Sequence, residues 1–573
     1  MLDNYTRGGQ LFLHKIRMLK QVFNKTLLGS FIISFAIMLV FSHKKLAGLD
    51  YSAGITYSKA YISEKASNTL ENKKNSSPKI TAIVKDKIYA KEISANQILN
   101  NKIFKNEFNL IMDAYYVLAL NILNLTTIIL LFNMLVWSKV GSKALEKDII
   151  KGSKVLTAKE VSSILRKSGK ASHFKIGEMP LVKDKETSHI LVTGTTGSGK
   201  SNCMYHLLPQ IRNQNQSAII VDFTGEMVQR YYSKERGDKI INPFDQSAST
   251  WDFWREVEDT HNLASLSNSL FTSRGSNYDE MWNNASKKFF EDAVRTISKY
   301  KNKSIKMLYN TLSSDPLIKV VKQLIGTSSA SMLDPKNDKT AMSIRTNTIA
   351  FIDWMEDFQE NEDYISITDW IKSISIKPGK WLFLSSSPKQ RNRLRNFHSM
   401  LMDLILNNIM ELGADNNRRI WLVIDELPAL KQLPSLPTAL SELRKYGGCI
   451  MAGIQSTNQL LEIYGQNSAY AMIDQFNTKF IFRTDDNNFA SYICKNFGEI
   501  EYEESSENFS YGAHEMRDGV SFSKLEKRKP LITPSDLSSL SDREAYVKLP
   551  DPSVRISKIL MDYITSQKIF PKL

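Results

Sequence analysis

The chain has 573 residues and a formal net charge of +15, a length typical of about three domains. The basic excess lies in residues 1–190, which contain 29 Lys and Arg against 14 Asp and Glu, whereas residues 191–573 contain 46 of each sign. Residues 191–573 are therefore neutral overall, and the net charge of the chain is no evidence that they bind nucleic acid. The three scattered cysteines exclude a disulfide framework.

Two long uncharged segments near the N-terminus predict membrane-spanning helices over residues 26–43 and 113–138. A helix needs about 20 apolar residues to cross a bilayer, and Trp137 near the end of the second segment suits the headgroup level. A cleaved signal peptide is the alternative for the first segment. The sequence "SHKKLAGLDY" that follows is basic and offers no small-residue cleavage site, which favours a span.

The orientation of the two spans does not follow from charge alone, because basic residues lie on both sides of the first one. The nucleotide motif described below decides it, since ATP is cytoplasmic. We therefore expect residues 1–25 and both termini in the cytoplasm. Residues 44–112 are expected on the other side of the membrane as a small or partly ordered domain. The basic residues around the first span are Arg7, Lys15, Arg17, Lys20, Lys25, Lys44 and Lys45.

A phosphate-binding loop is predicted at residues 194–201, "GTTGSGKS", which match the pattern G-x-x-x-x-G-K-[ST]. The preceding "HILV" predicts a strand and the following "NCMYHLLPQI" a helix, as the motif requires. Backbone N–H groups would wrap the phosphates of ATP, Lys200 would reach the β- and γ-phosphates, and Ser201 would ligate Mg²⁺. A glycine-rich turn without a ligand is the alternative. The predicted nucleotide-binding residues are Gly194, Thr195, Thr196, Gly197, Ser198, Gly199, Lys200 and Ser201.

A second element of the site is predicted in "RRIWLVIDELPAL", residues 418–430, where an apolar strand ends in Asp425 and Glu426. Asp425 would hold Mg²⁺ through water, and Glu426 would polarise the attacking water. The end of a parallel strand places both carboxylates at the edge of the sheet where ligands bind. A solvated acidic turn is the alternative.

Four further apolar runs predict strands of the same sheet, which gives a doubly wound α/β domain of at least six strands. The run over 217–226 ends in Asp222 and Glu226, and the run over 447–456 ends in Gln455, which is placed to sense the γ-phosphate. Each of these polar residues could instead serve as a turn or a helix cap. The other two runs lie at 380–387 and 478–484.

The pattern between residues 255 and 375 is helical and lacks strand signals, which predicts an all-α insertion. Over 279–300, Trp282, Phe289, Ala293 and Ile297 follow helical spacing. We expect a linker and the start of the motor domain over 139–185. The nucleotide-binding domain would then comprise two parts, 186–254 and 376–573.

Several narrower motifs occur together and in order with these features. They are "VDFTGE", "INPFDQSASTWDFW", "IDELPAL", "ELRKYGGCIMAGIQS" and "FSYGAHEMRDGVS". In this set the chain resembles the conjugative type IV coupling proteins of the TraD type. The resemblance extends from about residue 140 to 555, and the two predicted spans agree with it in layout.

The resemblance implies a homo-hexameric ATPase of the bacterial inner membrane, with residues 44–112 in the periplasm, a RecA-like motor domain and an all-α domain. Such proteins link a relaxosome, which is a relaxase bound to a nicked DNA strand, to a type IV secretion channel. They are thought to drive single-stranded DNA through it during conjugation. The same likeness gives Lys200, Ser201, Asp425 and Glu426 the roles stated above. It also implies an arginine that reaches a neighbour's site. Arg444 is the first candidate for that arginine and Arg483 the second, and either could be an ordinary surface or ion-pair arginine.

One departure from the family pattern concerns cargo. TraD-type proteins often carry a long C-terminal extension that engages the relaxosome, whereas this sequence stops at Leu573. Substrate selection would then depend on the helical insertion or on an adaptor. The alternative functions are delivery of protein effectors, an FtsK-like double-stranded DNA pump, and a membrane platform whose ATP site only stabilises a ring.

Overall fold

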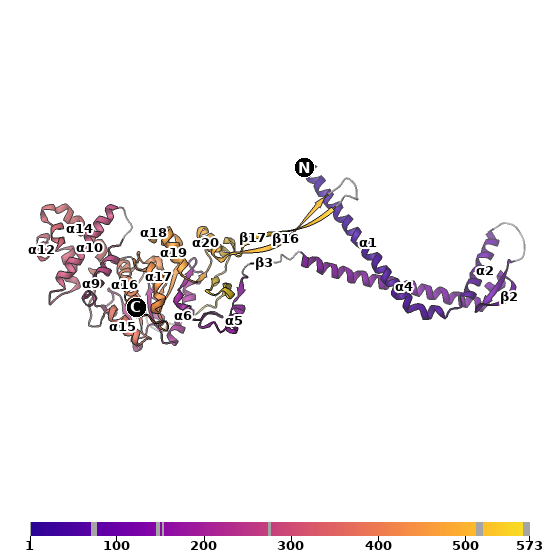
Figure 1. The fold of residues 1–573 in the computed structure, drawn as a ribbon, viewed down its shortest axis with the longest axis horizontal. Coiled ribbons are helices and arrows are strands. Elements are labelled where there is room, and N and C mark those ends of the chain that lie inside the picture. The colour runs from indigo at the N-terminus through magenta and orange to yellow at the C-terminus, as the bar shows by residue number, and fades with distance from the viewer. Residues whose placement is uncertain are drawn as a thin grey trace. The chain divides into compact units, whose positions relative to one another are not determined.

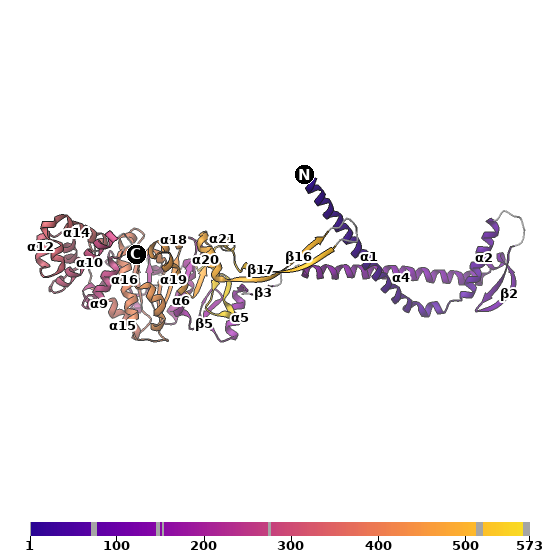
Figure 2. The same ribbon diagram turned by 45° about the horizontal axis from the view of Figure 1, so that its top comes forward.

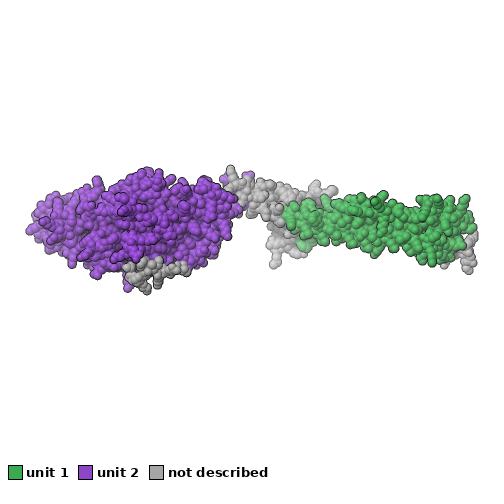
Figure 3. Space-filling view, turned by 90° about the horizontal axis from the view of Figure 1, so that it is seen from below, with its two compact units in different colours: residues 1–147 green, residues 148–573 purple. Residues whose placement is uncertain are grey.

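The computed structural model describes residues 2–69, 77–144, 149–151, 154–272, 277–510 and 519–564. The chain divides into two compact units, residues 1–147 and 148–573 (Figure 3). The predicted membrane segments lie in the first unit, and the nucleotide motifs lie in the second.

Two long helices, α1 (Leu2–Ala47) and α4 (Lys102–Ala144), pack against each other in the first unit (Figure 1). Within them, Ile16–Ala47 and Lys102–Val140 are long and apolar enough to cross a membrane, with mean hydropathies of 1.9 and 2.0. Both predicted spans lie inside these segments. Most of their apolar side chains are exposed, which is unfavourable in water and favourable in lipid.

A small α/β subdomain lies between these two helices in the sequence. It comprises α2 (Tyr51–Thr69), an antiparallel hairpin of β1 (Lys79–Val84) and β2 (Lys87–Ser94), and α3 (Ala95–Leu99). Its core combines four alanines and Ile98 with the large side chain of Phe104 at the start of α4; the residues are Ala53, Ala60, Ala82, Ala95, Ile98 and Phe104. The segment expected outside the membrane therefore has a core of its own.

A ten-stranded sheet forms the centre of the second unit, in the order β4-β19-β18-β15-β7-β14-β13-β8-β12-β9. Seven neighbouring strands, from β15 to β9, pair in parallel, and β18 is antiparallel to both of its neighbours. All six strands expected from the sequence lie in the parallel part, so the predicted α/β class is confirmed. The strands are β4 (Leu156–Thr157), β7 (Ile190–Thr193), β8 (Ser217–Asp222), β9 (Lys239–Ile241), β12 (Trp381–Ser385), β13 (Ile420–Ile424), β14 (Gly448–Ile454), β15 (Thr478–Ile481), β18 (Glu544–Lys548) and β19 (Ile556–Leu560).

The two faces of this sheet belong to different hydrophobic cores. Along β13, Leu422 and Ile424 join one core, while Trp421 and Val423 join the other, as the two-residue period of a strand requires. Helix α16 (Arg391–Glu411) packs into the first core and α6 (Lys200–Asn213) into the second (Figure 2). Both faces are therefore covered by helices, which explains why the central strands are apolar throughout.

Shorter elements surround the sheet. The helices are α5 (Ala158–Lys167), α7 (Glu226–Tyr231), α17 (Leu436–Glu442), α18 (Thr457–Tyr464), α19 (Gln466–Gln475), α20 (Asn487–Phe497) and α21 (Pro534–Ser538). A small sheet joins β3 (Ile149–Lys151), β16 (Glu499–Ser510) and β17 (Gly519–Pro530), and β5 (Ala171–Ile176) pairs with β6 (Met179–Val182). The middle of the predicted motif "FSYGAHEMRDGVS", residues 511–518, lies outside the described residues.

The segment predicted as an all-α insertion is mainly helical. It includes one two-residue strand, β11 (Tyr364–Ile365), which pairs in parallel with β10 (Thr250–Trp251) and was not expected from the sequence. Its helices are α8 (Phe253–Glu256), α9 (Thr260–Leu270), α10 (Asn277–Ile297), α11 (Ile305–Ser313), α12 (Leu317–Gln323), α13 (Ser328–Met332), α14 (Asp338–Ile352) and α15 (Ile367–Ile376).

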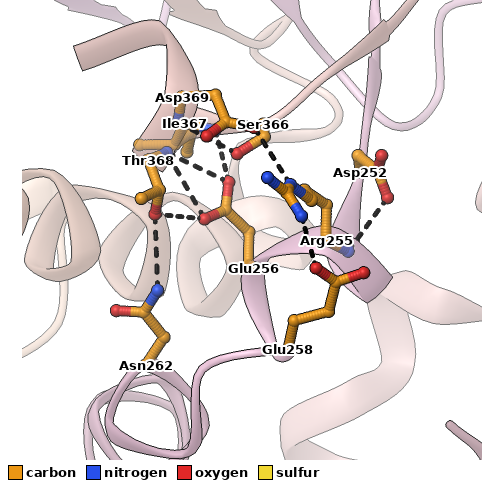
Figure 4. Close-up of polar contacts among 9 residues, drawn as sticks. All are labelled: Asp252, Arg255, Glu256, Glu258, Asn262, Ser366, Ile367, Thr368 and Asp369. Atoms are coloured by element: carbon orange, nitrogen blue, oxygen red, sulfur yellow. Dashed lines mark hydrogen bonds and ion pairs between the residues drawn. The ribbon is translucent and has the colours of Figure 1, made fainter. Parts of the chain in front are cut away.

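A buried carboxylate joins the two ends of this segment (Figure 4). Glu256, which is fully buried, accepts hydrogen bonds from the backbone N–H groups of Ile367 and Thr368 and from the Thr368 hydroxyl. These N–H groups belong to the first turn of α15, where a carboxylate is favoured. Next to it, Arg255 Nε donates to Asp369 at 3.1 Å. The residues that follow the "WDFW" motif therefore join the two ends of the insertion.

Candidate ATP-binding and hydrolysis site

The phosphate-binding loop connects β7 to α6, as the sequence predicted. Gly194 has a φ of +155°, and an added Cβ there would lie 2.6 Å from the Phe482 Cβ. Gly199 has a φ of +116°, and a Cβ would lie 3.0 Å from the Arg543 Cα. Only glycine combines these backbone angles with so close an approach. Both glycines are thus required by the conformation of the loop.

Neighbouring segments hold the loop in place. The Thr195 N–H donates to the Arg483 carbonyl at 2.9 Å, and the Arg543 N–H donates to the Ser198 carbonyl at 2.7 Å. Within the loop, the Ser198 hydroxyl donates to the Thr195 carbonyl at 2.7 Å. The turn that contains Arg543, between α21 and β18, escaped the sequence analysis because it carries no nucleotide motif. These bonds fix the loop through contacts outside the motif itself.

Lys200 begins α6 and is almost fully buried. Its ammonium donates to the carbonyls of Gly194, at 2.8 Å, and Thr195, at 3.0 Å. Burial lowers the pKa of Lys200, and the nearby carboxylates of Glu426 and Asp425 oppose that shift. A lysine in this position can donate to phosphate oxygens once they replace the loop carbonyls as its partners.

Ser201 and Asp425 face each other across the loop, with the Ser201 hydroxyl donating to Asp425 Oδ1 at 3.2 Å. Burial raises the pKa of Asp425, and the charge of Asp222 adds to that effect. A hydroxyl and a carboxylate are oxygen ligands of the kind Mg²⁺ prefers, and Mg²⁺ commonly takes few protein ligands beside nucleotide phosphates. The described residues contain no cluster of three His, Cys, Asp or Glu side chains suited to a metal.

Glu426 follows Asp425 and is 7% exposed. Its Oε1 accepts a hydrogen bond from the Gln455 N–H at 3.3 Å, while Oε2 is buried without a partner among the described residues. Burial raises the pKa of Glu426 to about 7, against the opposing charges of Lys200 and Arg391. A carboxylate with this pKa and a free oxygen can take up a proton near neutral pH.

Gln455 directly follows β14 and lies beside the loop. The Thr196 hydroxyl donates to Gln455 Oε1 at 3.0 Å, and the Gln455 backbone holds Glu426 as described. The residue thus contacts both the phosphate loop and the candidate base.

The other acidic strand end, at β8, has a structural role. Asp222 accepts hydrogen bonds from the backbone N–H groups of Thr224, Gly225, Met227 and Val228. It therefore caps the first turn of α7, which was one of the two interpretations left open by the sequence. Glu226 accepts a hydrogen bond from the Tyr205 hydroxyl at 3.0 Å.

The two arginine candidates lie in different environments. Arg444 is exposed in the short helix η6 (Leu443–Tyr446), directly before β14 begins. It lies at the edge of the sheet opposite the one at which the phosphate loop follows β7. Arg483 is engaged within its own chain by an ion pair to Asp542 at 2.9 Å. Of the two, only Arg444 is free of such a pair among the described contacts.

Gly453 is a residue of the site that the sequence analysis did not identify. Because Ile424 pairs with Ala452, Asp425 follows directly beside Gly453, and a Cβ on Gly453 would lie 1.9 Å from the Asp425 carbonyl oxygen. A glycine inside a buried strand was the available signal, since it marks a close approach of another backbone.

We therefore expect Gly453→Ala to displace Asp425 and Glu426 and to lower the rate of ATP hydrolysis by about 10²-fold, since small misplacements of catalytic groups have effects of that size. Gly413→Ala, at an exposed glycine with open space around it, is the matched control and should leave the rate unchanged. Steady-state phosphate release measures both. Wild-type turnover by the Gly453→Ala chain would contradict this geometry.

Comparisons with known proteins identify relatives of this chain. The family model described as "Type IV secretion-system coupling protein DNA-binding domain" matches residues 173–562. Coupling protein TraD of Escherichia coli (strain K12) is 31% identical over 576 residues, which cover 99% of this chain and 78% of that protein. Protein VirD4 of Agrobacterium fabrum is 23% identical over 166 residues, or 28% of this chain and 24% of its own length.

Solved structures give the same fold. The bacterial conjugative coupling protein TrwBdeltaN70 superposes with a TM-score of 0.64 at 24% identity, over 74% of this chain and 96% of its own. The family match covers most of the chain, and the TraD relative covers nearly all of it. The chain therefore belongs to the type IV secretion-system coupling protein family.

Proposed function

We propose that this protein is a membrane-anchored ATPase that couples a relaxosome to a type IV secretion channel and drives single-stranded DNA into it. The convergence of Lys200, Ser201, Asp425 and Glu426 at one edge of the sheet carries the proposal. The matching family model is described as a DNA-binding domain, which favours DNA over a protein effector as cargo.

ATP and Mg²⁺ are the proposed ligands of this site. TrwB, which has the same fold, has been solved with ADP and Mg²⁺ and with a non-hydrolysable ATP analogue. The residues of this chain suit the same ligands, because the loop offers backbone N–H groups for phosphates, and Ser201 and Asp425 offer oxygen atoms for the metal.

Each residue has a distinct proposed part in hydrolysis. Mg²⁺, when bound, supplies positive charge to the β- and γ-phosphates. Lys200 directs its ammonium to the same oxygens, and Ser201 and Asp425 hold the metal. Glu426 orients the attacking water and takes up its proton, for which a pKa of about 7 is suitable. Gln455 would sense the γ-phosphate through its side chain, while its backbone N–H holds the Glu426 carboxylate.

A homo-hexameric ring is part of the proposal, with Arg444 acting on the site of a neighbouring subunit. Arg444 is exposed and lies at the sheet edge opposite its own phosphate loop, so it is better placed to act on another copy. An arginine supplied in this way stabilises the charge of the transition state and raises hydrolysis rates by about 10³–10⁵-fold. Assembly would therefore switch the activity on.

The inner membrane is the proposed location, with α1 and α4 as the two spans and both termini in the cytoplasm. The exposed apolar side chains of these helices support it. ATP hydrolysis requires the second unit to be cytoplasmic, which leaves residues 44–112 in the periplasm. The proposed partners are relaxosome proteins and the secretion channel, which the protein would connect.

The full chain in detergent is expected to hydrolyse ATP faster when single-stranded DNA is added, because DNA is the proposed substrate that the ATPase moves. Phosphate release with and without DNA measures this effect.

Lys200→Ala should abolish nucleotide binding. Glu426→Gln should retain it and lower the rate by about 10²–10⁴-fold, the contribution of general base catalysis. Phosphate release and binding of a fluorescent ATP analogue measure these effects.

The matched control for Glu426→Gln is Glu411→Gln, at an exposed residue at the end of α16, which should retain full activity. If the assembled protein bound ATP but showed no turnover with any DNA, the motor proposal would be wrong and the site would serve only to stabilise a ring.

Mixing two inactive variants tests the role of Arg444. Arg444→Ala leaves the site intact, and Lys200→Ala leaves the arginine intact. In randomly mixed rings about one quarter of the interfaces would pair an intact site with an intact arginine, so activity should reappear. Lys445→Ala, at the exposed neighbour of Arg444, should be active without mixing. Failure of the mixture to recover activity would exclude action between subunits.

A further inference from the structure

A hollow of about 560 Å³ lies beside the hydrolysis site. Its walls come from the first turns of α16, from the segment 428–432 that follows Glu426, and from α18. Three cationic side chains and one carboxylate, Glu462 of α18, line it. Arg391 and Arg395 stand one helical turn apart on α16, and Lys431 belongs to the segment 428–432.

The three cations have no ion-pair partner among the described residues, although Glu462 lines the same hollow and opposes the lowered pKa of Arg395. Arg393, on the same helix, instead pairs with both Glu356 and Asp357. The Arg391 guanidinium lies 5.1 Å from the centre of the Phe223 ring. Carboxylates are therefore available to this helix, since Arg393 is paired with two of them, but among the described residues none pairs with the three cations of the hollow.

Arg395 is the most constrained of the three. Its Nη2 donates to the carbonyls of Pro428 and Leu430, each at 3.1 Å, and its Nε is buried without a partner among the described residues. Burial lowers the pKa of Arg395, and the charge of Arg391 lowers it further, while Glu462 opposes both. Burial and the charge of Arg395 likewise lower the pKa of Lys431.

A group of like charges held together at the protein surface is unfavourable until an anion binds to it. Arginine side chains suit phosphate groups in particular, because the guanidinium offers several donors in one plane. The amino end of α16, a helix of 21 residues, adds its partial positive charge to the same wall. The hollow thus combines three features that favour a phosphate.

We propose that Arg391, Arg395 and Lys431 form a binding site for backbone phosphates of the DNA strand that the motor moves. The proposal rests on the function proposed above and names a contact surface for its substrate. The lining residues, all of which are described, include no aromatic side chain on which a base could stack. Contact through phosphates alone does not depend on base sequence, which suits a motor that moves any transferred strand.

The position of the site connects DNA to hydrolysis. The two carbonyls that Arg395 holds belong to the segment that begins two residues after Glu426. A phosphate that draws Arg395 toward itself therefore acts on the segment that closely follows the candidate base in the chain. This arrangement offers a physical route by which bound DNA could alter the hydrolysis rate.

Binding of fluorescently labelled oligothymidine to the full chain in detergent, followed by anisotropy at several salt concentrations, tests the site. The double variant Arg391→Gln/Lys431→Gln should bind about tenfold more weakly at low salt. Its slope of log affinity against log salt should be smaller by about 1.4, since each phosphate contact to a single strand contributes about 0.7.

Two controls separate loss of the site from loss of the fold. Arg393→Gln, on the same helix but paired with carboxylates, should keep the wild-type affinity and slope. Arg391→Lys/Lys431→Arg keeps the charges and should restore most of the slope, although it changes the same positions.

The outcomes also separate this site from the function on which it rests. If the wild-type chain neither bound single-stranded DNA nor responded to it, both proposals would fail. If the wild type bound and the double variant bound equally well with the same slope, the site alone would be wrong. An unchanged affinity together with loss of the assembled ring in sedimentation would also overturn it, and would instead assign the hollow to an acidic segment of a neighbouring subunit.

Discussion

The parallel pairing of β7, β14 and β13 is the constraint on which the site depends. Thr193 pairs with Ile454, and Ile424 pairs with Ala452, so three strands that are distant in sequence end at one edge of the sheet. The phosphate loop, Gln455 and the Asp425–Glu426 pair begin where these strands stop. Because register is set by backbone hydrogen bonds and by burial of both faces, the sheet brings these groups to one edge, where the hydrogen bonds of Ser201 to Asp425 and of Gln455 to Glu426 connect them.

Burial at this edge of the sheet also shifts the pKa values of the ionisable groups in the site. It lowers the pKa of Lys200 and raises the pKa values of Asp425 and Glu426, so the free site holds its charged groups at a cost in free energy. A bound nucleotide with its metal brings charges of both signs, which can restore that balance. Arg391 lies where it influences Glu426 on one side and lines the cationic hollow on the other. The electrostatics of the two sites are therefore linked.

Much of this arrangement was predictable from the sequence, because buried parallel strands appear as short apolar runs and the phosphate loop has a strict pattern. The six predicted strands and the Ser201–Asp425 contact follow from those signals. Contacts made by unmarked residues were not predictable. The turn at Arg543 that holds the loop, the close approach at Gly453, and the grouping of Arg391 with Lys431 all arise from long-range packing. The capping role of Asp222 could be decided only by its four backbone donors.

The central claim is that the loop and the end of β13 form one metal–nucleotide site. Electron paramagnetic resonance of Mn²⁺, added in place of Mg²⁺ with a non-hydrolysable ATP analogue, tests it directly. The account predicts phosphorus hyperfine coupling from the nucleotide to the bound metal, and weaker metal binding in both Ser201→Ala and Asp425→Asn chains. Metal binding that kept its affinity and its phosphorus coupling in both variants would contradict the account.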